Sequence, residues 1–480
     1  MGRGKGGNLV TAVVVGSGPN GLAAAATLAQ AGVDVTVIEQ AMSLGGGARS
    51  VRTDAGVLHD ECSGFHPFAV DNEFTRCVDL GAHGLEWAWP DVQFTSPIAG
   101  STDGVACERS VDVTAAGLGP DRSAWLRMFS AGCHEHELLS FEALRPPLHV
   151  PKHPFVLGGF GIRAALPATA WNRTLRSPRT QSLWLGLAAH ACQNLSSPFS
   201  SSIGLALGVA AQTVGWPVAR GGSASIVLAM ESFARERGAR FETGRAVSSL
   251  DELGRQDIVL LDTSPAAARR IIGDRMPARM ARAYERFRHG PAAFKVDFAV
   301  EGGVPWLHEA SRRAGTVHVG GSADELLRAE SLVSKGVMPE RPFVLVGQQY
   351  LADHGRSFGD VHPVYSYAHV PAGFAGDATQ QILDQIERVA PGFKERITET
   401  RVRSTTQLAQ YNPNYIGGDI LTGASTARQL LGRPRLSPWP FLTGVPNVYL
   451  CSAATSPGAG AHGMCGYLAA EGALRRIRAG

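Results

Sequence analysis

Short apolar runs that lead into glycine-rich turns form the clearest pattern in this chain. The first run, residues 9–15, is short and unbroken, which is typical of a strand buried in a parallel sheet. A glycine-rich turn follows, and residues 22–31 are rich in alanine, as in a helix that packs closely on a sheet. Gly32 ends this segment, and residues 33–38 form a second apolar run. The pattern predicts a strand–turn–helix–strand unit at the front of the chain.

The last part of the chain repeats the order of strand, glycine loop and helix. Residues 448–452 predict a strand, residues 458–463 a loop without bulky side chains, and residues 464–477 a helix with arginines near its C-terminal end. A C-terminal helix requires a capping residue at its start, but it does not require a long glycine-rich loop before it. The glycines therefore indicate that another group comes close to the backbone at this point.

The central part of the chain predicts two further kinds of structure. Residues 66–219 look mostly helical and apolar, whereas residues 291–434 hold several alternating segments typical of strands. Residues 226–238 predict a helix, residues 239–250 a pair of strands, and residues 257–265 a buried strand that ends in a turn. We therefore expect an α/β protein, in which a Rossmann-like domain is joined to an α+β domain with a mixed or antiparallel sheet.

The composition is that of an ordinary globular protein, and it argues against several classes of function. The formal net charge of +3 is too small to favour nucleic acid as a partner. The seven cysteines include no CxxC pair, so the chain predicts no disulfide framework or zinc ribbon and favours a reducing, cytoplasmic setting. No apolar run reaches the roughly 18 residues of a membrane helix. The apolar run near the start is too short for a signal peptide.

The turn after the first strand predicts a dinucleotide site. In the spacing GxGxxG the first glycine permits a tight turn, the second lets the backbone approach a pyrophosphate, and the third lets helix and strand pack closely. The helix N-terminus adds free N–H groups. Glu39 ends the second strand, where a carboxylate binds ribose hydroxyls and disfavours a 2′-phosphate, so the site suits FAD or NAD rather than NADP. The turn consists of Gly16, Ser17, Gly18, Pro19, Asn20 and Gly21.

A second glycine cluster follows Glu39 and Gln40 and favours FAD. The stretch EQAMSLGGGARS resembles the second signature of the FAD-binding oxidoreductases related to amine oxidases and phytoene desaturases. Those enzymes usually show GGR, with Ser or Thr three residues after the arginine. In this chain a glycine stands at the arginine position and Arg49 is displaced by two residues, whereas Ser50 fits. The resemblance implies FAD contacts from Gly45, Gly46, Gly47, Arg49 and Ser50.

Similarity to bacterial phytoene-dehydrogenase-like proteins extends nearly from end to end. It is carried by HDECSGFHPFAV, LAAHAC, FKVDFAV and YNPNYIGGDI, together with both glycine-rich ends. The resemblance implies an FAD domain assembled from three segments and a substrate domain assembled from two. The expected segments are 8–65, 220–290 and 435–480 for the FAD domain, and 66–219 and 291–434 for the substrate domain.

The same resemblance explains the glycines before the last helix. In the relatives this loop lies along the ribityl chain and the flavin ring, and the helix N-terminus faces the pyrimidine edge, where reduced flavin carries negative charge. A flat ring that lies against backbone requires glycine and alanine there. The resemblance implies adenine contacts from the backbone of Val247, and contacts with the ring from Ser452, Gly460, His462, Gly463 and Met464.

The candidate catalytic residues lie on one predicted strand and in one loop. Lys295 and Asp297 share one face of the strand, which either points to solvent or brings Lys295 towards the flavin, as in related amine oxidases. His462, in the flavin loop, is either catalytic or a residue that bonds only to backbone. His66 and His190 are candidates for the substrate pocket.

Two other clusters of polar side chains are candidate binding sites. The two histidines of the stretch CHEH, residues 133–136, lie on different faces of a helix, so no metal site is expected. Residues 269–288 hold seven arginines, which fit either a solvated helical face or peripheral contact with lipid headgroups.

These patterns predict an FAD-dependent oxidoreductase that transfers hydride between the flavin and an apolar or isoprenoid-like carbon skeleton. A redox-neutral isomerase or cyclase, an amine oxidase and a non-catalytic flavin-binding protein are the alternatives. Only one complete GxGxxG fingerprint is present, because the stretch LGGFGIRAAL has neither the spacing nor a following acid. We therefore expect no tightly bound NAD(P)H, and oxygen, a quinone or the substrate itself as the electron acceptor.

Overall fold

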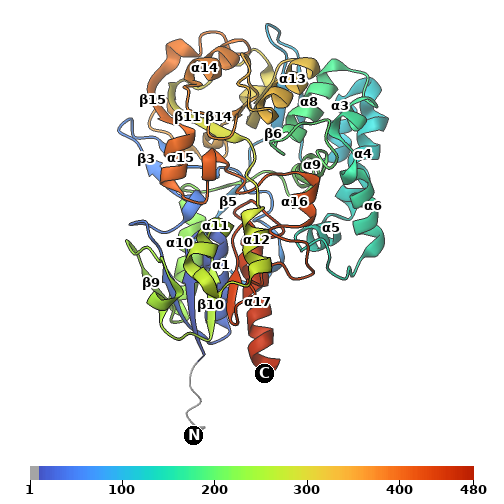
Figure 1. Ribbon diagram of the computed structural model, residues 1–480. Coiled ribbons are helices and arrows are strands. Elements are labelled where there is room, and N and C mark those ends of the chain that lie inside the picture. The colour runs from blue at the N-terminus through green and yellow to red at the C-terminus, as the bar shows by residue number, and fades with distance from the viewer. Residues whose placement is uncertain (1–9, 480) are drawn as a thin grey trace.

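Two large β-sheets, the helices that cover them and a separate layer of helices make up most of the described residues. The computed structural model describes residues 10–479. Residues 8 and 9 of the expected FAD domain, and most of the segment before the first strand, lie outside the described residues. Figure 1 shows a parallel sheet with its helices in the lower half, a second sheet at the upper left and most of the other helices at the upper right.

The lower sheet is parallel throughout, with the strand order β16-β10-β1-β2-β9. Strands β1, β10 and β16 are short and apolar, as expected for strands with both faces covered, whereas the edge strand β9 carries exposed charged residues. Three widely separated parts of the chain contribute to it: β1 Thr11–Val15, β2 Asp34–Ile38, β9 Arg240–Glu242, β10 Ile258–Leu261 and β16 Val448–Leu450.

Helices cover both faces of this sheet. Alternate residues of β1 and β10 pack against α1, α10 and α17 on one face, and the intervening residues pack against α11 and α12 on the other. The bounds are α1 Pro19–Gln30, α10 Ala224–Glu236, α11 Pro265–Ile272, α12 Ala278–Glu285 and α17 Met464–Ala479.

The C-terminal helix α17 lies against α1 with almost no space between their backbones. A Cβ at Gly466 would lie 1.7 Å from the carbonyl oxygen of Asn20. The alanines of α1 at positions 23–26 are completely buried in the same contact region. Part of the glycine content near the chain end therefore serves helix packing.

The upper sheet is mixed, with the strand order β15-β11-β14-β13-β12-β6-β7. Only β12 and β6 pair in parallel, and the other neighbours are antiparallel. The predicted α/β class, with a Rossmann-like and a mixed sheet, is confirmed. The bounds are β6 Val92–Pro97, β7 Gly104–Cys107, β11 Ala292–Glu301, β12 Ala314–Val319, β13 Val344–Gly347, β14 Val361–Val370 and β15 Ile397–Arg403.

Two sequence expectations for secondary structure were wrong in part. Strands β6 and β7 lie in the region expected to be mostly helical, because their apolar residues pack on the rest of the sheet. The strand pair expected at 239–250 is reduced to β9, since only Arg240–Glu242 find a partner, in β2. The remainder of that segment follows the end of the parallel sheet without ladder pairing.

The two faces of the upper sheet have different environments. Phe294, Val296 and Phe298 of β11 face an apolar core that includes α14, Thr379–Glu387. The opposite face is directed towards the helical layer at the right of Figure 1. That layer contains α3 Val111–Gly117, α4 Arg122–His134, α5 His136–Ala143, α6 Pro154–Ala165, α7 Ala168–Asn172, α8 Pro178–Ala189 and α9 Ser202–Ala211.

Short elements complete the described chain. Two small ribbons pair β3 with β4 and β5 with β8. Among the described residues, no helix is both long and apolar enough to span a membrane. The remaining elements are α2 Glu73–Cys77, α13 Ala323–Ser334, α15 Thr405–Tyr411, α16 Ala427–Leu431, β3 Ser50–Arg52, β4 Leu58–Asp60, β5 Trp87–Ala88 and β8 Val218–Ala219.

Candidate functional site

One cavity of about 880 Å³ connects the end of the parallel sheet with the upper sheet and the helical layer. Its lining includes the glycine turn after β1, the loop before α17, side chains of β14 and residues of α5 and α9. Most of the residues predicted to bind a cofactor line it. They are Gly16, Ser17, Gly18, Pro19, Asn20, Glu39, Gln40, Gly46, Gly47, Arg49, Val247, Ser452, Gly460 and His462.

The glycines in the turn after β1 have no room for a side chain. A Cβ at Gly16 would lie 2.7 Å from the backbone oxygen of Asp262, and a Cβ at Gly21 would lie 2.2 Å from the oxygen of Gly16. Gly16 also has a φ of +99°, which favours glycine. Gly21 does not line the cavity but allows α1 to pack on the turn, in the role expected for the third glycine of the fingerprint.

Asp262, at the end of β10, places a carboxyl group against this turn, and the sequence analysis did not identify it. Its Oδ2 accepts the backbone N–H of Gly21 at 3.0 Å. Burial raises the pKa of Asp262 to about 7, the N–H groups of Gly21 and Gly18 oppose this rise, and the carboxylate of Glu39 adds to it. The N-terminus of α1 therefore already has a partner of its own before any phosphate binds.

Glu39 is held in place by the glycine turn. Its Oε2 accepts from the backbone N–H of Ser17 at 2.9 Å and from Ser17 Oγ at 2.6 Å, and its Oε1 accepts the N–H of Ala41 at 2.9 Å. The side chain is buried on the cavity wall at the end of β2. The carboxylate is thus oriented in advance beside the turn, as a site for ribose hydroxyls requires.

The second glycine cluster packs against the first. Gly45 donates its N–H to the backbone oxygen of Ser17 at 3.1 Å, and a Cβ at Gly46 would lie 2.9 Å from the Cα of Gly18. A Cβ at Gly47 would lie 1.9 Å from the hydroxyl of Tyr415, so this tyrosine occupies the space that a side chain would need. That contact gives a physical reason why glycine, and not the arginine of the related signature, stands at position 47.

The residues that flank this cluster differ in their access to the cavity. Arg49 lines it, donates to the backbone oxygens of Leu44 and Ser43, and lies 3.6 Å from Glu39. Gly45 and Ser50 do not line it. Ser50 Oγ donates to Asp60 at 2.8 Å and accepts from the backbone of α10, so it fixes the loop rather than facing a ligand.

The loop before α17 presents backbone to the cavity from Ala459 to His462. His462 Nδ1 accepts the N–H of Met464 at 3.0 Å, so the imidazole caps α17. Burial lowers the pKa of His462 to about 4, so the ring is neutral at pH 7. This geometry fits a residue that organises the loop and lies beside the ligand.

Gly463 and Met464 do not face the cavity, in contrast to the expected contact with the ring. A Cβ at Gly463 would lie 2.8 Å from the Cβ of Ala23 and 3.0 Å from the ring of Phe74. Met464 is buried in the core that surrounds α1. The chain turns into α17 at this point, and both residues are directed towards α1 and α2.

Lys295 and Asp297 are buried and form an ion pair, and neither lines the cavity. Lys295 Nζ lies 4.3 Å from the ring centre of Tyr365, whose ring lines the cavity. His59 Nδ1 lies 3.8 Å from Asp297. The solvent-facing alternative for this face is therefore wrong, and the pair lies in a buried polar layer outside the cavity lining.

Both candidate pocket histidines line the cavity as neutral imidazoles. His66 Nε2 lies 2.9 Å from Ser223 Oγ, and burial lowers its pKa to about 4. His190 Nε2 lies 2.9 Å from His318 Nε2, and burial lowers the pKa of His190 to about 3. A neutral pair of this kind shares one proton between the two facing nitrogens.

Three further lining residues were missed by the sequence analysis. Tyr365 and Tyr367 of β14 have perpendicular rings with centres 5.9 Å apart. Their spacing of two residues on a predicted strand, which puts them on one face, was a usable signal. Arg433 lines the cavity but follows no recognisable pattern in the sequence.

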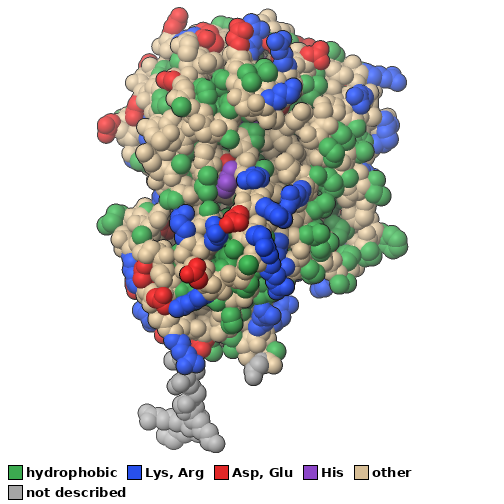
Figure 2. All heavy atoms as spheres, in the orientation of Figure 1, with side chains coloured by type: hydrophobic (Ala, Val, Ile, Leu, Met, Phe, Trp, Pro, Cys, Tyr) green, Lys and Arg blue, Asp and Glu red, His purple; other side chains and the backbone are tan. Residues whose placement is uncertain are grey.

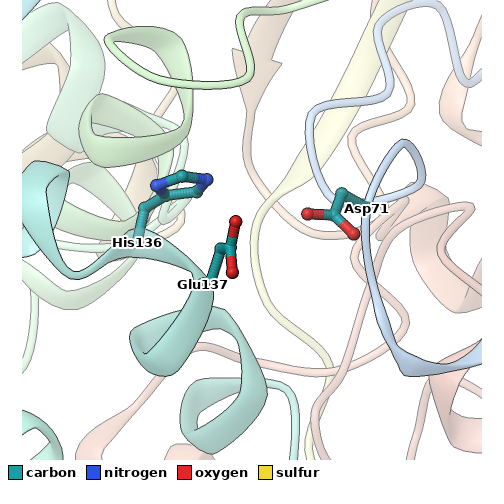
Figure 3. A group of neighbouring side chains, drawn as sticks. All are labelled: Asp71, His136 and Glu137. Atoms are coloured by element: carbon teal, nitrogen blue, oxygen red, sulfur yellow. The ribbon is translucent and has the colours of Figure 1, made fainter. Parts of the chain in front are cut away.

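A cluster with metal-binding side chains lies beside the cavity. Asp71, His136 and Glu137 offer ligand atoms within 4.8 Å of one another, and Figure 3 shows the last two on α5 facing Asp71 on a loop. Arg76, however, donates to both carboxylate oxygens of Asp71 at 2.6 and 2.8 Å. A cation would have to displace this ion pair, so we assign no metal to the cluster.

The arginines of residues 269–288 are exposed, and two of them pair, Arg269 with Glu285 and Arg275 with Asp251. Basic side chains are prominent across the middle of Figure 2, and apolar side chains extend along its right side, where Figure 1 places α6. Phe155 of that helix is 93% exposed. Peripheral membrane contact stays a prediction.

Comparisons with known proteins support the fold of this chain. A family model of the NAD(P)-binding Rossmann-like domain matches residues 14–83. No match is found among curated proteins. An oxidoreductase from Methanosarcina mazei has a TM-score of 0.62 at 13% identity, covering 97% of this chain and 100% of its own.

Two amine oxidases are similar in structure. Putrescine oxidase bound to putrescine has a TM-score of 0.60 at 16% identity, covering 98% of this chain and 99% of its own. Cyclohexylamine oxidase from Brevibacterium oxydans has a TM-score of 0.56 at 16% identity, with 98% of both chains covered. The fold of this chain is therefore similar to that of these two oxidases along almost its whole length.

Proposed function

We propose that this protein is an FAD-dependent oxidoreductase acting on an apolar carbon skeleton, of the phytoene-dehydrogenase-like type. The observation that carries the proposal is that one continuous cavity is lined by the glycine turn after β1, by the loop before α17 and by an apolar wall. A dinucleotide with a flat ring at its far end matches this order of surfaces.

The residues present fit the ADP part of FAD. Two glycine clusters meet without side chains, and a Cβ at Gly46 would intrude on Gly18. Glu39 is fixed by Ser17 at the position of a ribose-binding carboxylate. Val247 and Arg245 line the adjoining part of the cavity, where the adenine is expected.

The residues at the other end fit a flat ring. Ala459, Gly460 and Ala461 present small side chains or none, and Ser452 lies beside them in the lining. When bound, FAD supplies a two-electron carrier that accepts or donates hydride. The loop from Ala459 to His462 would hold the ring of this carrier beside the part of the cavity that the upper sheet and the helical layer line.

The wall beyond this loop fits an apolar substrate. It is formed mainly by aliphatic and aromatic side chains from the helical layer, with the neutral His190 among them. Such a wall excludes water and selects by shape rather than charge. The residues are Leu139, Leu144, Phe160, Ile203, Leu207 and Trp216.

Amine oxidation is the second candidate, because Tyr365 and Tyr367 form an aromatic pair on the cavity wall. Perpendicular tyrosine rings can orient an amine through their π-faces. Putrescine oxidase and cyclohexylamine oxidase, which share the fold, act on amines by their names. The substrate experiment below separates the two.

The first test is cofactor content. The purified protein should be yellow and should release FAD on acid treatment, and a protein that stays colourless with added FAD would contradict the proposal.

The second test is made in the absence of oxygen. The holoprotein is mixed with a panel of primary amines and, separately, with a panel of isoprenoid hydrocarbons. Bleaching of the flavin by the hydrocarbons favours oxidation of an apolar carbon skeleton, and bleaching by the amines favours amine oxidation. Formation of product without bleaching indicates a redox-neutral reaction. Re-oxidation with oxygen or with a quinone then identifies the electron acceptor.

A further inference from the structure

Arg433 is a buried cation on the cavity wall with too few partners. It follows α16 and is 4% exposed. Its Nη2 donates to the backbone oxygen of Gly423 at 2.5 Å. Its Nε has no hydrogen-bond partner, and among the described residues no carboxylate lies within ion-pair distance of the guanidinium.

The nearest acid does not satisfy this charge. Asp419 lowers the electrostatic cost of burying Arg433, but its carboxylate accepts from the N–H groups of Gly290, Leu421 and Gly423. His289 Nδ1 is also 3.2 Å from Asp419. Burial lowers the pKa of Arg433, which is consistent with a guanidinium short of counter-charge.

A second buried arginine shows what full pairing looks like in this protein. Arg356 is 1% exposed, donates to Asp60 at 2.6 Å and to Asp353 at 3.2 Å, and gives a third hydrogen bond to the oxygen of Ala219. It does not line the cavity. Because an unpaired buried charge is strongly destabilising, the difference between the two arginines points to a missing partner at Arg433.

The position of Arg433 indicates where that partner lies. A Cβ at Gly458 would lie 2.6 Å from Arg433 Nη1. Gly458 opens the loop whose next residues, 459–462, line the cavity. The guanidinium therefore lies beside the loop assigned above to the flat ring.

We propose that Arg433 binds an anionic oxygen of the molecule that occupies this end of the cavity. The proposal rests on the proposed function for the identity of the cofactor. Two sources present such an oxygen: a carboxylate on an otherwise apolar substrate, and the pyrimidine edge of reduced flavin. A guanidinium suits both, since it offers two parallel N–H donors to an anionic acceptor.

The first arm of the experiment tests the substrate source. FAD-loaded wild type, Arg433→Met and Arg433→Lys are titrated with decanoate and with decan-1-ol, and the flavin absorbance reports binding. Arg428→Met is the matched control, because Arg428 is an exposed arginine on the neighbouring α16. If a carboxylate is the partner, Arg433→Met should weaken decanoate binding at least about tenfold and leave decan-1-ol unchanged.

The second arm tests the cofactor source. The midpoint potential of the flavin is measured in the same proteins without decanoate. If reduced flavin is the partner, Arg433→Met should make the potential more negative, Arg433→Lys should shift it less, and Arg428→Met should not shift it. Either a loss of decanoate affinity or a fall in potential supports the proposal and tells the two sources apart.

A folded Arg433→Met protein with unchanged decanoate affinity and unchanged potential would overturn the proposal. If Arg433→Met fails to fold, the Arg433→Lys protein decides, because lysine keeps the positive charge but lacks the two parallel N–H donors. A decanoate affinity and a flavin potential equal to those of the wild type would then overturn the proposal. If the wild type takes up no FAD, the proposed function fails. Decanoate binding is then measured by the rise in melting temperature that it causes. An equal rise in the wild type and in Arg433→Lys would overturn the inference about Arg433.

Discussion

The backbone N–H of Gly21 donates to Oδ2 of Asp262 at 3.0 Å, across 241 residues of sequence. The glycine turn that would receive a pyrophosphate is thus closed from one side by an acid of this chain. A Cβ at Gly18 would lie 2.6 Å from the same oxygen. The carboxyl group and the expected diphosphate therefore act on the same helix N-terminus.

This arrangement predicts pH-dependent affinity for FAD. Burial raises the pKa of Asp262 from 3.8 to about 7, so the folded protein keeps this proton between those values and loses it as the pH rises further. An ionised Asp262 repels the diphosphate, so FAD affinity should fall above pH 7, by up to about tenfold per pH unit if one proton is linked. Fluorescence titrations of apoprotein with FAD from pH 6 to 8.5 measure it.

Asp262→Asn supplies the comparison for that titration. The amide keeps the shape of the side chain and an acceptor oxygen for Gly21 but cannot ionise, so the pH dependence of FAD affinity should flatten.

The same linkage between protonation of Asp262 and stability applies to folding. Between pH 3.8 and about 7 the free energy of unfolding of the wild-type apoprotein should decrease as the pH rises, and the variant should lack that component. Equal pH slopes in both proteins would show that Asp262 does not control binding.

Glu39→Ala should weaken FAD binding by roughly 1–3 kcal/mol, because the charged acceptor for the ribose is lost. The loss should also loosen Ser17, whose N–H and hydroxyl both bond to Glu39. Isothermal titration with FAD and with ADP should show similar losses for both ligands. Glu236→Ala, at an exposed glutamate of α10, is the control and should bind both ligands as the wild type does.

Gly460→Ala and Gly463→Val should separate the two functions of the last glycine loop. Gly460 lines the cavity at φ +135°, and a Cβ there would lie 2.7 Å from the ring of His462, so the alanine variant should lose affinity for FAD but not for ADP. Gly463 is directed towards Ala23 and Phe74, so valine there should lower the melting temperature and affect both ligands together. Retention of full FAD affinity by Gly460→Ala would remove the loop from the ring site.

Lys295 should contribute to stability through Asp297. Lys295→Met removes the ion-pair partner of a buried carboxylate, which should lower the free energy of unfolding by about 3–5 kcal/mol. Adding Asp297→Asn should recover most of that loss. Urea unfolding of the apoproteins measures both effects, and a single variant as stable as the wild type would show that the pair is not energetically coupled.

The parts of the fold that follow from local pattern were predictable, and those that depend on distant partners were not. The unit from β1 to β2 needs only apolar runs and three glycines within about 30 residues, and its turn and Glu39 were identified from the sequence. Asp262 was missed because its role comes from a contact across 241 residues. Its own neighbourhood reads only as the end of a strand.

Arg433 and Gly463 show the same limit for side-chain direction. An arginine in a loop is usually solvated, and only the packing of residues near 419–458 buries this one without a counter-ion. Gly463 lies in a loop correctly associated with the cavity, but whether a glycine faces a ligand or a neighbouring helix depends on where α17 begins relative to α1. Neither packing arrangement leaves a pattern in the sequence.

NADH and NADPH should not reduce the flavin rapidly. The glycine-rich stretch at residues 157–166 lies in and just after α6 rather than between a strand and a helix. Added Cβ atoms at Gly158, Gly159 and Gly161 would meet nothing within 4 Å, so these glycines do not serve a close backbone approach. The seven-stranded sheet has a single parallel pair of strands, β12 with β6, and so offers no second βαβ unit for a nicotinamide dinucleotide.

Stopped-flow mixing tests this prediction. Mixing the oxidised holoprotein with micromolar NADH or NADPH, without oxygen, should leave the flavin spectrum unchanged over seconds, and dithionite is the positive control for reduction. Rapid bleaching by either nucleotide would place a second dinucleotide site on this chain.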